Sequence, residues 1–321
     1  MKTKENFYSE NSKPSRATKV AAVIPIHNGM PHLPKCLQAL KRAQKPDIEL
    51  SVFLVDAQST DESVSAAYNI FPELHVVSVD QSVWWTGAIN EGTRAAVESG
   101  VDFILWMNPD DEAEPDAIQN LLEAAKASEK SIHVCGVIHS KRPQWVEFGS
   151  IMRIAFFRLP HPVAIPAASL PESKGLIPID VSGGHGALIP SSLFQRGRRL
   201  LRPELLPHYY GDHSFYLNAK NYGCRAYGVP NAIVRNETAS DSFQNGYCFR
   251  DLRKWKTFLF SRRSAGNLRD RPLLALFHFP IPFNILWAIY YVIRSLGAIV
   301  RAVLWNLPVQ RDLEAKLNDQ S

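Results

Sequence analysis

A cluster of acidic side chains follows an apolar run in the first half of the chain. Residues 103–107 are apolar and short enough for a buried strand, and Pro109 ends the run by removing a backbone hydrogen-bond donor. The carboxylates of Asp110–Glu112 come next. Because adjacent carboxylates repel one another, the cluster is costly unless a cation or basic groups neutralise it. Oxygen ligands on a loop suit Mg²⁺ or Mn²⁺ shared with a phosphate. The alternative is an acidic first turn of a helix at residues 114–116.

Two further stretches carry polar or aromatic groups where strands end. Asp56 follows the apolar residues 50–55, and an Asp in this position faces the ligand crevice of an open sheet, where it can accept hydrogen bonds from a base or ribose. Ser59 suits the same crevice or the cap of the next helix. Trp84 and Trp85 open a predicted helix and could stack on a base or sugar, although core packing is the alternative for one of them.

The elements that position these groups alternate between strands and helices. Four apolar runs predict strands, at residues 20–26, 50–55, 74–79 and 103–107. Leu33, Leu37 and Leu40 mark one face of a helix between the first two strands. This alternation predicts an α/β fold with an open, mostly parallel sheet flanked by helices. The chain has no G-x-G-x-x-G and no G-x-x-x-x-G-K-[ST], which disfavours dinucleotide-binding dehydrogenases and P-loop nucleotide hydrolases.

Four motifs of the first half resemble those of family 2 glycosyltransferases in order and spacing. They are residues 23–29 (VIPIHNG), 55–61 (VDAQSTD), 87–92 (GAINEG) and 108–110 (NPD). Members of that family are inverting transferases that use nucleotide-diphosphate sugars and have the GT-A fold. The resemblance extends over residues 20–240 and implies the same fold and donor class for this chain.

The resemblance also implies roles for particular residues. Residues 108–110 are similar to the family's Asp-x-Asp motif, whose last acid binds the metal on the diphosphate, so this role falls to Asp110. Asp111 is a weaker metal candidate, as is Asn236, because many relatives have a metal-ligating His near that position. The implied cofactor is Mn²⁺ or Mg²⁺, which offsets the charge of a leaving diphosphate. The predicted donor site comprises Pro25, His27, Asn28, Asp56, Ser59, Trp84, Trp85, Gly87, Asn90, Asn108 and Gly184.

The second half of the chain supplies the predicted catalytic base. The pair Gly211-Asp212 is similar to the family's Glu-Asp motif, with Gly211 in place of the Glu, so the resemblance assigns the base to Asp212. A helix cap is the alternative role for Asp212. Residues 131–180 contain six prolines and are expected to be irregular, as an insertion over the site that forms part of the acceptor surface. His185 is expected to be an ordinary hydrogen-bonded histidine.

The C-terminal part differs from the rest in its basic and apolar character. Residues 273–293 carry no formal charge but are interrupted by Pro280 and Pro282. An interfacial, membrane-associating segment is therefore expected rather than a clean membrane span, with a packed helix pair or an oligomer contact as the alternative. The predicted parts are a flexible tail at 1–18, a GT-A domain at 19–245 (nucleotide-binding half 19–125, acceptor and catalytic half 126–245) and the membrane-associating segment at 246–321.

Composition is consistent with a folded enzyme that handles anions. Of the 321 residues, 45% are hydrophobic and 21% charged, as in ordered proteins, and the net charge of +5 fits a phosphate-bearing ligand or an anionic membrane surface. The four cysteines are too far apart to predict a zinc site or a disulfide framework, and the N-terminus lacks an apolar signal segment. We therefore expect a cytoplasmic protein at the inner face of the cell membrane.

The sequence thus predicts a transferase that moves a hexose or deoxyhexose from a nucleotide-diphosphate sugar to a hydroxyl, with inversion. The acceptor would be a glycan or a lipid-linked molecule in cell-surface polysaccharide or other glycan biosynthesis, and no nucleic acid is involved. Two alternatives stay open. One is a nucleotidyltransferase. The other is a non-catalytic GT-A-like subunit that binds glycans or scaffolds a complex, which the residues Gly211 and Asn236 favour.

Overall fold

The computed structural model describes residues 16–128, 130–152, 161–172, 175–194, 197–237 and 252–305. Its strands are β1 (Thr18–Ile26), β2 (Ile48–Asp56), β3 (His75–Ser78), β4 (Phe103–Trp106), β5 (Asp111–Ala113), β6 (Ser131–His139), β7 (Trp145–Ile151), β8 (His161–Pro166), β9 (Ile177–Ile179), β10 (Ala187–Pro190) and β11 (Arg225–Asn236). Its α-helices are α1 (His32–Ala43), α2 (Ser63–Ile70), α3 (Trp84–Glu98), α4 (Ala117–Ala127), α5 (Gly211–Asn221), α6 (Leu252–Phe260), α7 (Asp270–His278) and α8 (Phe283–Trp305). The short helices η1 (Gln81–Val83), η2 (Ala167–Glu172) and η3 (Ser191–Phe194) connect them.

One mixed sheet forms the centre of the molecule. Its main order is β3-β2-β1-β4-β10-β6-β11-β5, with β7 and β8 extending from β6, and β9 pairing with β11. The strands β3, β2, β1 and β4 pair in parallel, and β6 pairs in parallel with β11. Because β2 and β4 flank β1 on opposite sides, the chain reverses its direction of winding at β1, and a crevice opens there at the carboxyl ends of the strands. The α/β class predicted from the sequence is confirmed.

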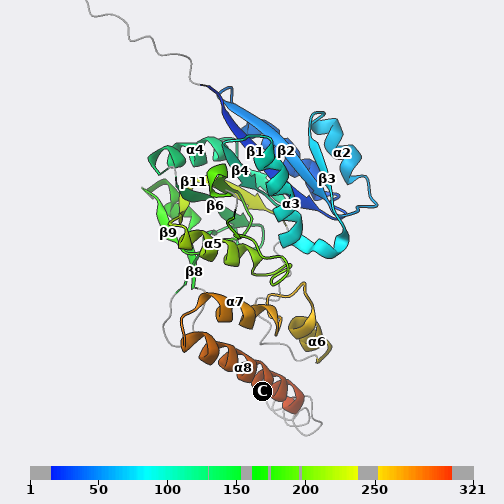
Figure 1. The fold of residues 1–321 in the computed structure, drawn as a ribbon, viewed down its shortest axis with the longest axis vertical. Helices are drawn as coiled ribbons and strands as arrows, with labels where there is room; N and C mark the ends of the chain where they lie inside the picture. Colours follow the sequence, from blue (N-terminus) through cyan, green and yellow to red (C-terminus); the bar gives the residue numbers. More distant parts are fainter. Residues whose placement is uncertain are drawn as a thin grey trace, which may run out of the picture.

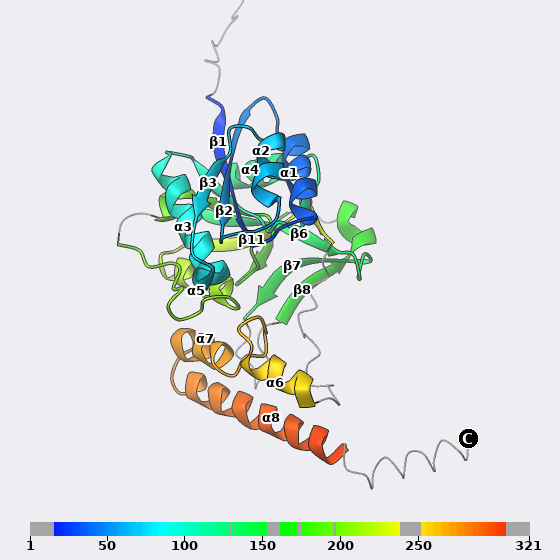
Figure 2. The same ribbon diagram turned by 90° about the vertical axis from the view of Figure 1, so that its right-hand side faces the viewer.

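Helices cover both faces of the sheet (Figures 1 and 2). Even-numbered residues of β1, such as Ile24, pack with α1, α2 and α4, and odd-numbered residues, such as Val23, pack with α3 and α5. The close approach of α3 depends on Gly92, because a Cβ at that position would overlap the side chain of Val55 and lie 2.6 Å from Val23 Cγ1. The N-terminus of α3 is thereby held at the same edge as the ends of β1 and β2.

The expectation that residues 131–180 are irregular is wrong for most of the part the structure describes. This region contains β6, which is buried in the middle of the sheet, and the β7–β8 hairpin. Its prolines are compatible with strands because Pro162 and Pro166 lie on β8, which pairs only with β7, and Pro178 lies on β9, which pairs only with β11. Proline is tolerated on edge strands, where its missing N–H breaks no ladder.

The helices α6, α7 and α8 form a separate layer below α5 and the β7–β8 hairpin (Figures 1 and 2). This layer contacts the start of α5 directly, since Tyr210 Oη donates to Ala265 O at 2.5 Å and Ser214 Oγ lies 2.8 Å from His278 Nε2. The apolar stretch 273–293 is divided between α7 and α8 around Pro280–Pro282. The predicted boundary at residue 245 and most of the predicted tail at 1–18 lie outside the described residues.

The surface of α8 is unusually apolar. Along its length it exposes the side chains of Phe283, Ile285, Leu286, Ile289, Val292, Ile293, Leu296, Val300, Val303 and Leu304. Among the described residues α8 is the one helix long and apolar enough to cross a membrane, over Phe283–Arg301, with a mean hydropathy of 1.5. Only 22% of that stretch is buried, so α8 is not a core helix of the layer.

Candidate active site

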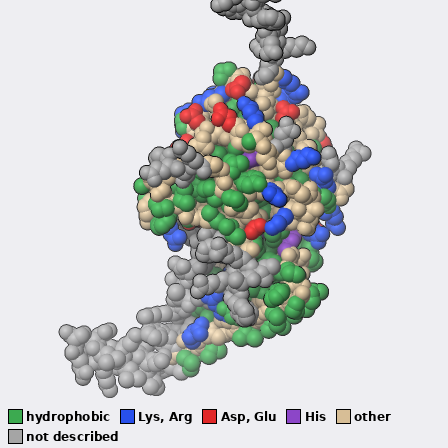
Figure 3. Space-filling model, turned by 90° about the vertical axis from the view of Figure 1, so that its left-hand side faces the viewer, with side chains coloured by type: hydrophobic (Ala, Val, Ile, Leu, Met, Phe, Trp, Pro, Cys, Tyr) green, Lys and Arg blue, Asp and Glu red, His purple; other side chains and the backbone are tan. Residues whose placement is uncertain are grey.

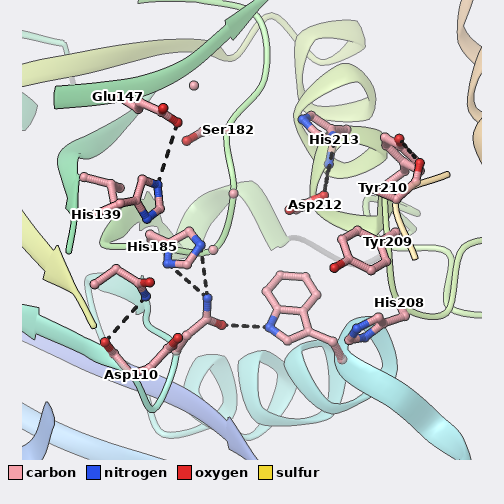
Figure 4. Close-up of a pocket in the computed structure, with 18 of the residues that line it drawn as sticks. Asp110, His139, Glu147, Ser182, His185, His208, Tyr209, Tyr210, Asp212 and His213 are labelled. Carbon is pink, nitrogen blue, oxygen red and sulfur yellow. Dashed lines mark hydrogen bonds and ion pairs between the residues drawn. The ribbon is translucent and has the colours of Figure 1, made fainter. Parts of the chain in front are cut away.

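A cleft of about 1150 Å³ opens at the carboxyl ends of the central strands. The turns after β1 and β4 form one wall, with Asn28 and Asp110, and the start of α5 forms the opposite wall, with Asp212 (Figure 4). The β7–β8 hairpin and the stretch 182–185 close the cleft on a third side. The C-terminal layer also reaches the cleft, through Phe258, Ala265, Gly266 and Arg271.

The two adjacent acids after β4 face opposite surroundings. Asp111 is fully buried, and its carboxylate accepts hydrogen bonds from the backbone N–H of Asn108 at 2.9 Å and from Asn236 Nδ2 at 2.8 Å. It also lies 2.8 Å from His185 Nδ1. Asp110, in contrast, lines the cleft. Of the predicted metal candidates, Asp111 and Asn236 are therefore hydrogen-bonded to each other, and Asp110 is the carboxylate that lines the cleft, beside Asn236.

The charges and the burial around Asp110 disfavour the ionised form of its carboxyl group. Burial, followed by the charge of Asp111, raises the pKa of Asp110, and His185 partly opposes this. Burial alone would lower the pKa of His185, but Asp111 and Asp110 outweigh it and raise that pKa to about 9. His185 is hydrogen-bonded, as expected from the sequence, and its partner Asp111 makes this contact an ion pair.

The donor set at Asp110 suits a divalent metal that arrives with a phosphate. Among the described residues no three His, Cys, Asp or Glu side chains gather into a site that could hold a metal by itself. Mg²⁺ sites on nucleotides commonly use one or two carboxylates and complete their coordination with substrate phosphates and water. Asp110 fits that pattern, and the metal would then be held jointly by protein and diphosphate.

The turns after β1 and β2 are locked together by the predicted donor residues. Asn28 Oδ1 accepts from the backbone N–H of Thr60 at 2.8 Å, the backbone N–H of Asn28 donates to Ser59 Oγ at 2.9 Å, and Asp56 Oδ1 accepts from the N–H of Ser59 at 3.0 Å. His27 and Asn28 line the cleft, whereas Asp56 and Ser59 are not among the residues that line it. These bonds fix the edge on which a nucleotide would lie.

Pro25 is buried within β1 and does not reach the cleft.

The two tryptophans at the start of α3 occupy different places. Trp85 lines the cleft, and its indole N–H donates to Asn108 Oδ1 at 2.9 Å. Gly184 lies against this ring, because a Cβ there would overlap Trp85 Cζ2. Trp84 lies outside the cleft lining, beside His208 and under the guanidinium groups of Arg262 and Arg263.

The other two predicted donor residues of α3, Gly87 and Asn90, also lie outside the cleft lining.

Asp212 stands in the first turn of α5 and faces the cleft (Figure 4). Its Oδ1 accepts from the backbone N–H of His213 at 2.7 Å, which fixes the side chain. Its Oδ2 points toward the Gly183 backbone, at 3.8 Å from where a Cβ on Gly183 would be. One oxygen of the carboxylate is therefore directed at the part of the cleft lined by Gly183 and His185.

The model of the family described as Glycosyl transferase family 2 matches residues 21–198, more than half of the chain. The chain belongs to this family. It transfers a sugar from a nucleotide sugar. No curated protein sequence matches the chain.

Several solved structures share the GT-A-like fold of this glycosyltransferase. S. aureus TarS 1-349 in complex with UDP is 13% identical with a TM-score of 0.53, over 90% of this chain and 91% of that one. GalNAc-T7 with UDP, GalNAc and Mn²⁺ is 13% identical with a TM-score of 0.57, over 92% of this chain and 59% of that one. The mannosyltransferase PcManGT from Pyrobaculum calidifontis, with GDP-Man and Mn²⁺, is 16% identical with a TM-score of 0.52, over 96% of this chain and 81% of that one.

The structure explains why this glycosyltransferase has Gly211 where the resemblance predicts Glu. A Cβ at Gly211 would overlap Thr86 Oγ1 and lie 2.8 Å from Thr86 Cγ2, so the first residue of α5 can approach α3 only without a side chain. The approach is fixed further by the N–H of Thr86, which donates to Pro207 O at 2.9 Å. A Glu at this position would therefore not fit the contact between the two helices that carry Trp85 and Asp212.

A first prediction follows from this contact. Gly211→Ala is expected to lower the free energy of unfolding by about 1 to 3 kcal/mol, the usual cost of overpacking, and to lower kcat because Asp212 shifts with the helix. Unfolding in urea and initial rates measure the two effects. Gly297→Ala on α8 is the matched control, since a Cβ there meets no atom within 4 Å. Equal stability of the two variants would contradict the tight contact.

Sequence reasoning missed several residues of the cleft. His139, Trp145 and Glu147 come from the region expected to be irregular, and Arg271 comes from the C-terminal layer. The signal that could have found the hairpin residues is the placement of the apolar Val146 and Phe148 two residues apart, with the acidic Glu147 between them. No sequence pattern indicated that the C-terminal layer would border the same cleft.

Proposed function

We propose that this glycosyltransferase transfers a hexosyl or deoxyhexosyl group, with inversion, from a nucleotide-diphosphate sugar to a hydroxyl of a glycan or lipid-linked acceptor. The observation that carries the proposal is the placement of Asp110 and Asp212 on opposite walls of one cleft (Figure 4). An inverting displacement needs a base on the side of the sugar opposite to the leaving diphosphate, and these walls supply the two sides. The likeness to enzymes solved with UDP and with GDP-Man supports a donor of this type.

The residues divide the reaction between them. Asp212 takes the proton of the acceptor hydroxyl as the oxygen attacks the anomeric carbon. The bond between that carbon and the diphosphate oxygen breaks, and the nucleoside diphosphate leaves with the electron pair. Trp85 and Asn108, which are hydrogen-bonded to each other, form the surface on which the donor sugar lies. A divalent metal bound at Asp110 would offset the charge on the departing diphosphate.

Release of the nucleoside diphosphate tests this proposal. We expect the full-length protein with Mn²⁺ to release it slowly from at least one of UDP-glucose, UDP-N-acetylglucosamine, UDP-galactose, GDP-mannose and dTDP-rhamnose, with water as the acceptor. A nucleotidyltransferase would instead release pyrophosphate from a nucleoside triphosphate and a sugar phosphate. A non-catalytic subunit would release neither product, and either result would contradict the proposal.

We also propose that α8 places the enzyme on the inner face of the cell membrane. The buried face of α8 is covered along its length, by α7 at Trp287 and Tyr291 and by α6 at Ala298. Ile289 lies two residues before Tyr291, about 200° away around the helix, so the exposed apolar side chains form the opposite face. In Figure 3 apolar side chains gather over the lower part of the surface, where α8 lies in Figure 1.

This geometry favours a helix that lies in the membrane surface rather than one that crosses it. A helix with one long side packed on its own protein and the other side apolar can bury only the second side in lipid. Arg294 and Arg301 are seven residues apart and share one flank of α8, where they would meet anionic headgroups. A lipid-linked acceptor would then approach the cleft past the C-terminal layer, whose Arg271 borders it.

Vesicle binding tests the membrane proposal. The full-length protein is expected to sediment with vesicles of phosphatidylglycerol and phosphatidylcholine, and the double variant Ile289→Glu/Ile293→Glu should lose at least about tenfold in binding, because two charges replace exposed apolar groups. Tyr68→Glu, at another exposed apolar position, on α2, is the control and should bind as the wild type does. Binding that is unaffected by the double change would contradict the role of α8.

A further inference from the structure

The β7–β8 hairpin presents a distinct set of side chains to the cleft. The burial of β7 alternates strictly, so that Val146 and Phe148 are fully buried while Trp145, Glu147 and Gly149 share the other face and line the cleft. The indole of Trp145 is 41% exposed, an unusual state for so large a ring. Core packing therefore accounts for one face of the strand and leaves the composition of the other face unexplained.

The backbone of the hairpin is shaped to aim this face. The pairing of β7 with β8 shifts register between Glu147 and Gly149, which is a bulge, and bulges next to active sites redirect side chains. Gly149 has φ of +118°, and a Cβ there would overlap the carbonyl oxygen of Val181. Gly149 therefore packs closely against Val181, and the chain continues from there through Ser182 and Gly183.

Glu147 is poised to accept hydrogen bonds from a ligand. His139 Nε2 lies 3.7 Å and Arg142 Nη1 3.9 Å from its two carboxylate oxygens, distances too long for direct hydrogen bonds. Interaction with His139 nevertheless lowers the pKa of Glu147, so its carboxylate is ionised at neutral pH. Glu147 lines the cleft, and Arg142, which also lines it, offers donors beside the carboxylate.

We propose that Trp145 and Glu147 form the subsite that binds a hexopyranose unit of the acceptor. An exposed aromatic ring beside a carboxylate and a guanidinium matches a sugar, which has an apolar C–H face and a rim of hydroxyls. Alternate residues of a strand are roughly 6.8 Å apart, so one ring can lie on the indole while its hydroxyls reach the carboxylate. The inference rests on the proposed transferase function and gives its acceptor a chemical class.

The position of this face indicates that it binds the acceptor rather than the donor. In Figure 4 Glu147 lies next to Ser182, with His185 between it and Asp110. The following residue, Gly183, borders Asp212 Oδ2. A sugar held at the hairpin would therefore direct a hydroxyl along the stretch 182–183 toward the base, while the nucleotide lies at the ends of β1 and β4.

Saturation-transfer difference NMR on the full-length protein tests the subsite. The probes are methyl glycosides of glucose, galactose, mannose, N-acetylglucosamine and rhamnose. We expect saturation of the ring protons of at least one probe, a loss of at least about tenfold in its affinity in Trp145→Ala, and a loss of about tenfold in Glu147→Gln, in line with a hydrogen bond to a charged group. Tyr68→Ala, which removes an equally exposed ring on α2, should bind as the wild type does.

The proposal is overturned if the wild type saturates none of these probes, or if Trp145→Ala and Glu147→Gln bind them unchanged. Thermal stabilisation by UDP and GDP, measured on the same samples, shows whether each variant is folded with its donor edge intact. Failure of the wider function is seen separately. Saturated sugar protons without release of any nucleoside diphosphate would keep the subsite and remove the transferase, whereas release without sugar binding would remove the subsite alone.

Discussion

Asp212→Asn is expected to lower kcat by about 100- to 10,000-fold, the usual contribution of a positioned general base. The change is isosteric, so α5 and the hydrogen bond from the N–H of His213 should persist while the ability to take a proton is lost. Affinity for the donor nucleotide should change little, because Asp212 lies on the opposite wall from Asn28 and Asp110. Initial rates of nucleoside diphosphate release, together with a nucleotide titration, measure the two quantities.

The matched control for this variant is Asp116→Asn. Asp116 also stands at the start of a helix, α4, but it is exposed and pairs with Lys45 at the surface. If acids at helix N-termini mattered only through the helix dipole, the two variants would lose similar, small amounts of stability and neither would lose activity. Unchanged turnover in Asp212→Asn would exclude Asp212 as the base.

Alanine substitutions of the neighbours Asp110 and Asp111 should have different effects, one on nucleotide binding and the other on stability. Asp111→Ala removes the acceptor for the N–H of Asn108 and for Asn236, and it leaves His185 without its counter-ion. Breaking a buried ion pair from one side commonly costs about 3 to 5 kcal/mol, and we expect a loss of this size in the free energy of unfolding. Urea titration followed by circular dichroism measures it.

Asp110→Ala is the matched control, one residue away. Burial and the charge of Asp111 already disfavour the ionised form of Asp110, so its removal should leave stability unchanged or slightly higher while nucleotide binding is lost. A carboxylate kept at an unfavourable position is typical of a functional site. Similar destabilisation by both alanine changes would show that the two acids share one structural role.

The first half of the fold could be predicted because its elements are local and regular. Apolar runs in the sequence predict the strands at residues 20–26, 50–55 and 103–107. Each run is followed by polar residues that line the cleft or hold its edge in place. A parallel sheet gathers such ends at one edge, so Asn28 and Asp110 could be placed together from the sequence alone. Asp212 was placed through the resemblance, since its position depends on pairings between distant strands.

The rest could not be predicted because it depends on contacts that the sequence pattern does not express. Whether Asp110 or Asp111 faces the cleft is decided by the partners of Asp111, which come from residues 185 and 236. The hairpin was not predicted because its prolines disfavour a central strand, whereas edge strands tolerate proline. Arg271 lines the cleft because the C-terminal layer packs against the rest of the protein, which is a contact between segments far apart in the chain.

The most direct test of the account is thermal stabilisation by UDP, GDP, dTDP and CDP, each with and without Mn²⁺, in the wild type and in Asp110→Ala. A ligand that binds only the native state adds about 2.7 kcal/mol of stability at a hundredfold excess over Kd. We predict that at least one nucleotide raises the Tm of the wild type, that the rise requires the metal, and that Asp110→Ala abolishes it. No rise with any nucleotide, or a rise that survives in Asp110→Ala, would contradict a metal-assisted donor site at the end of β4.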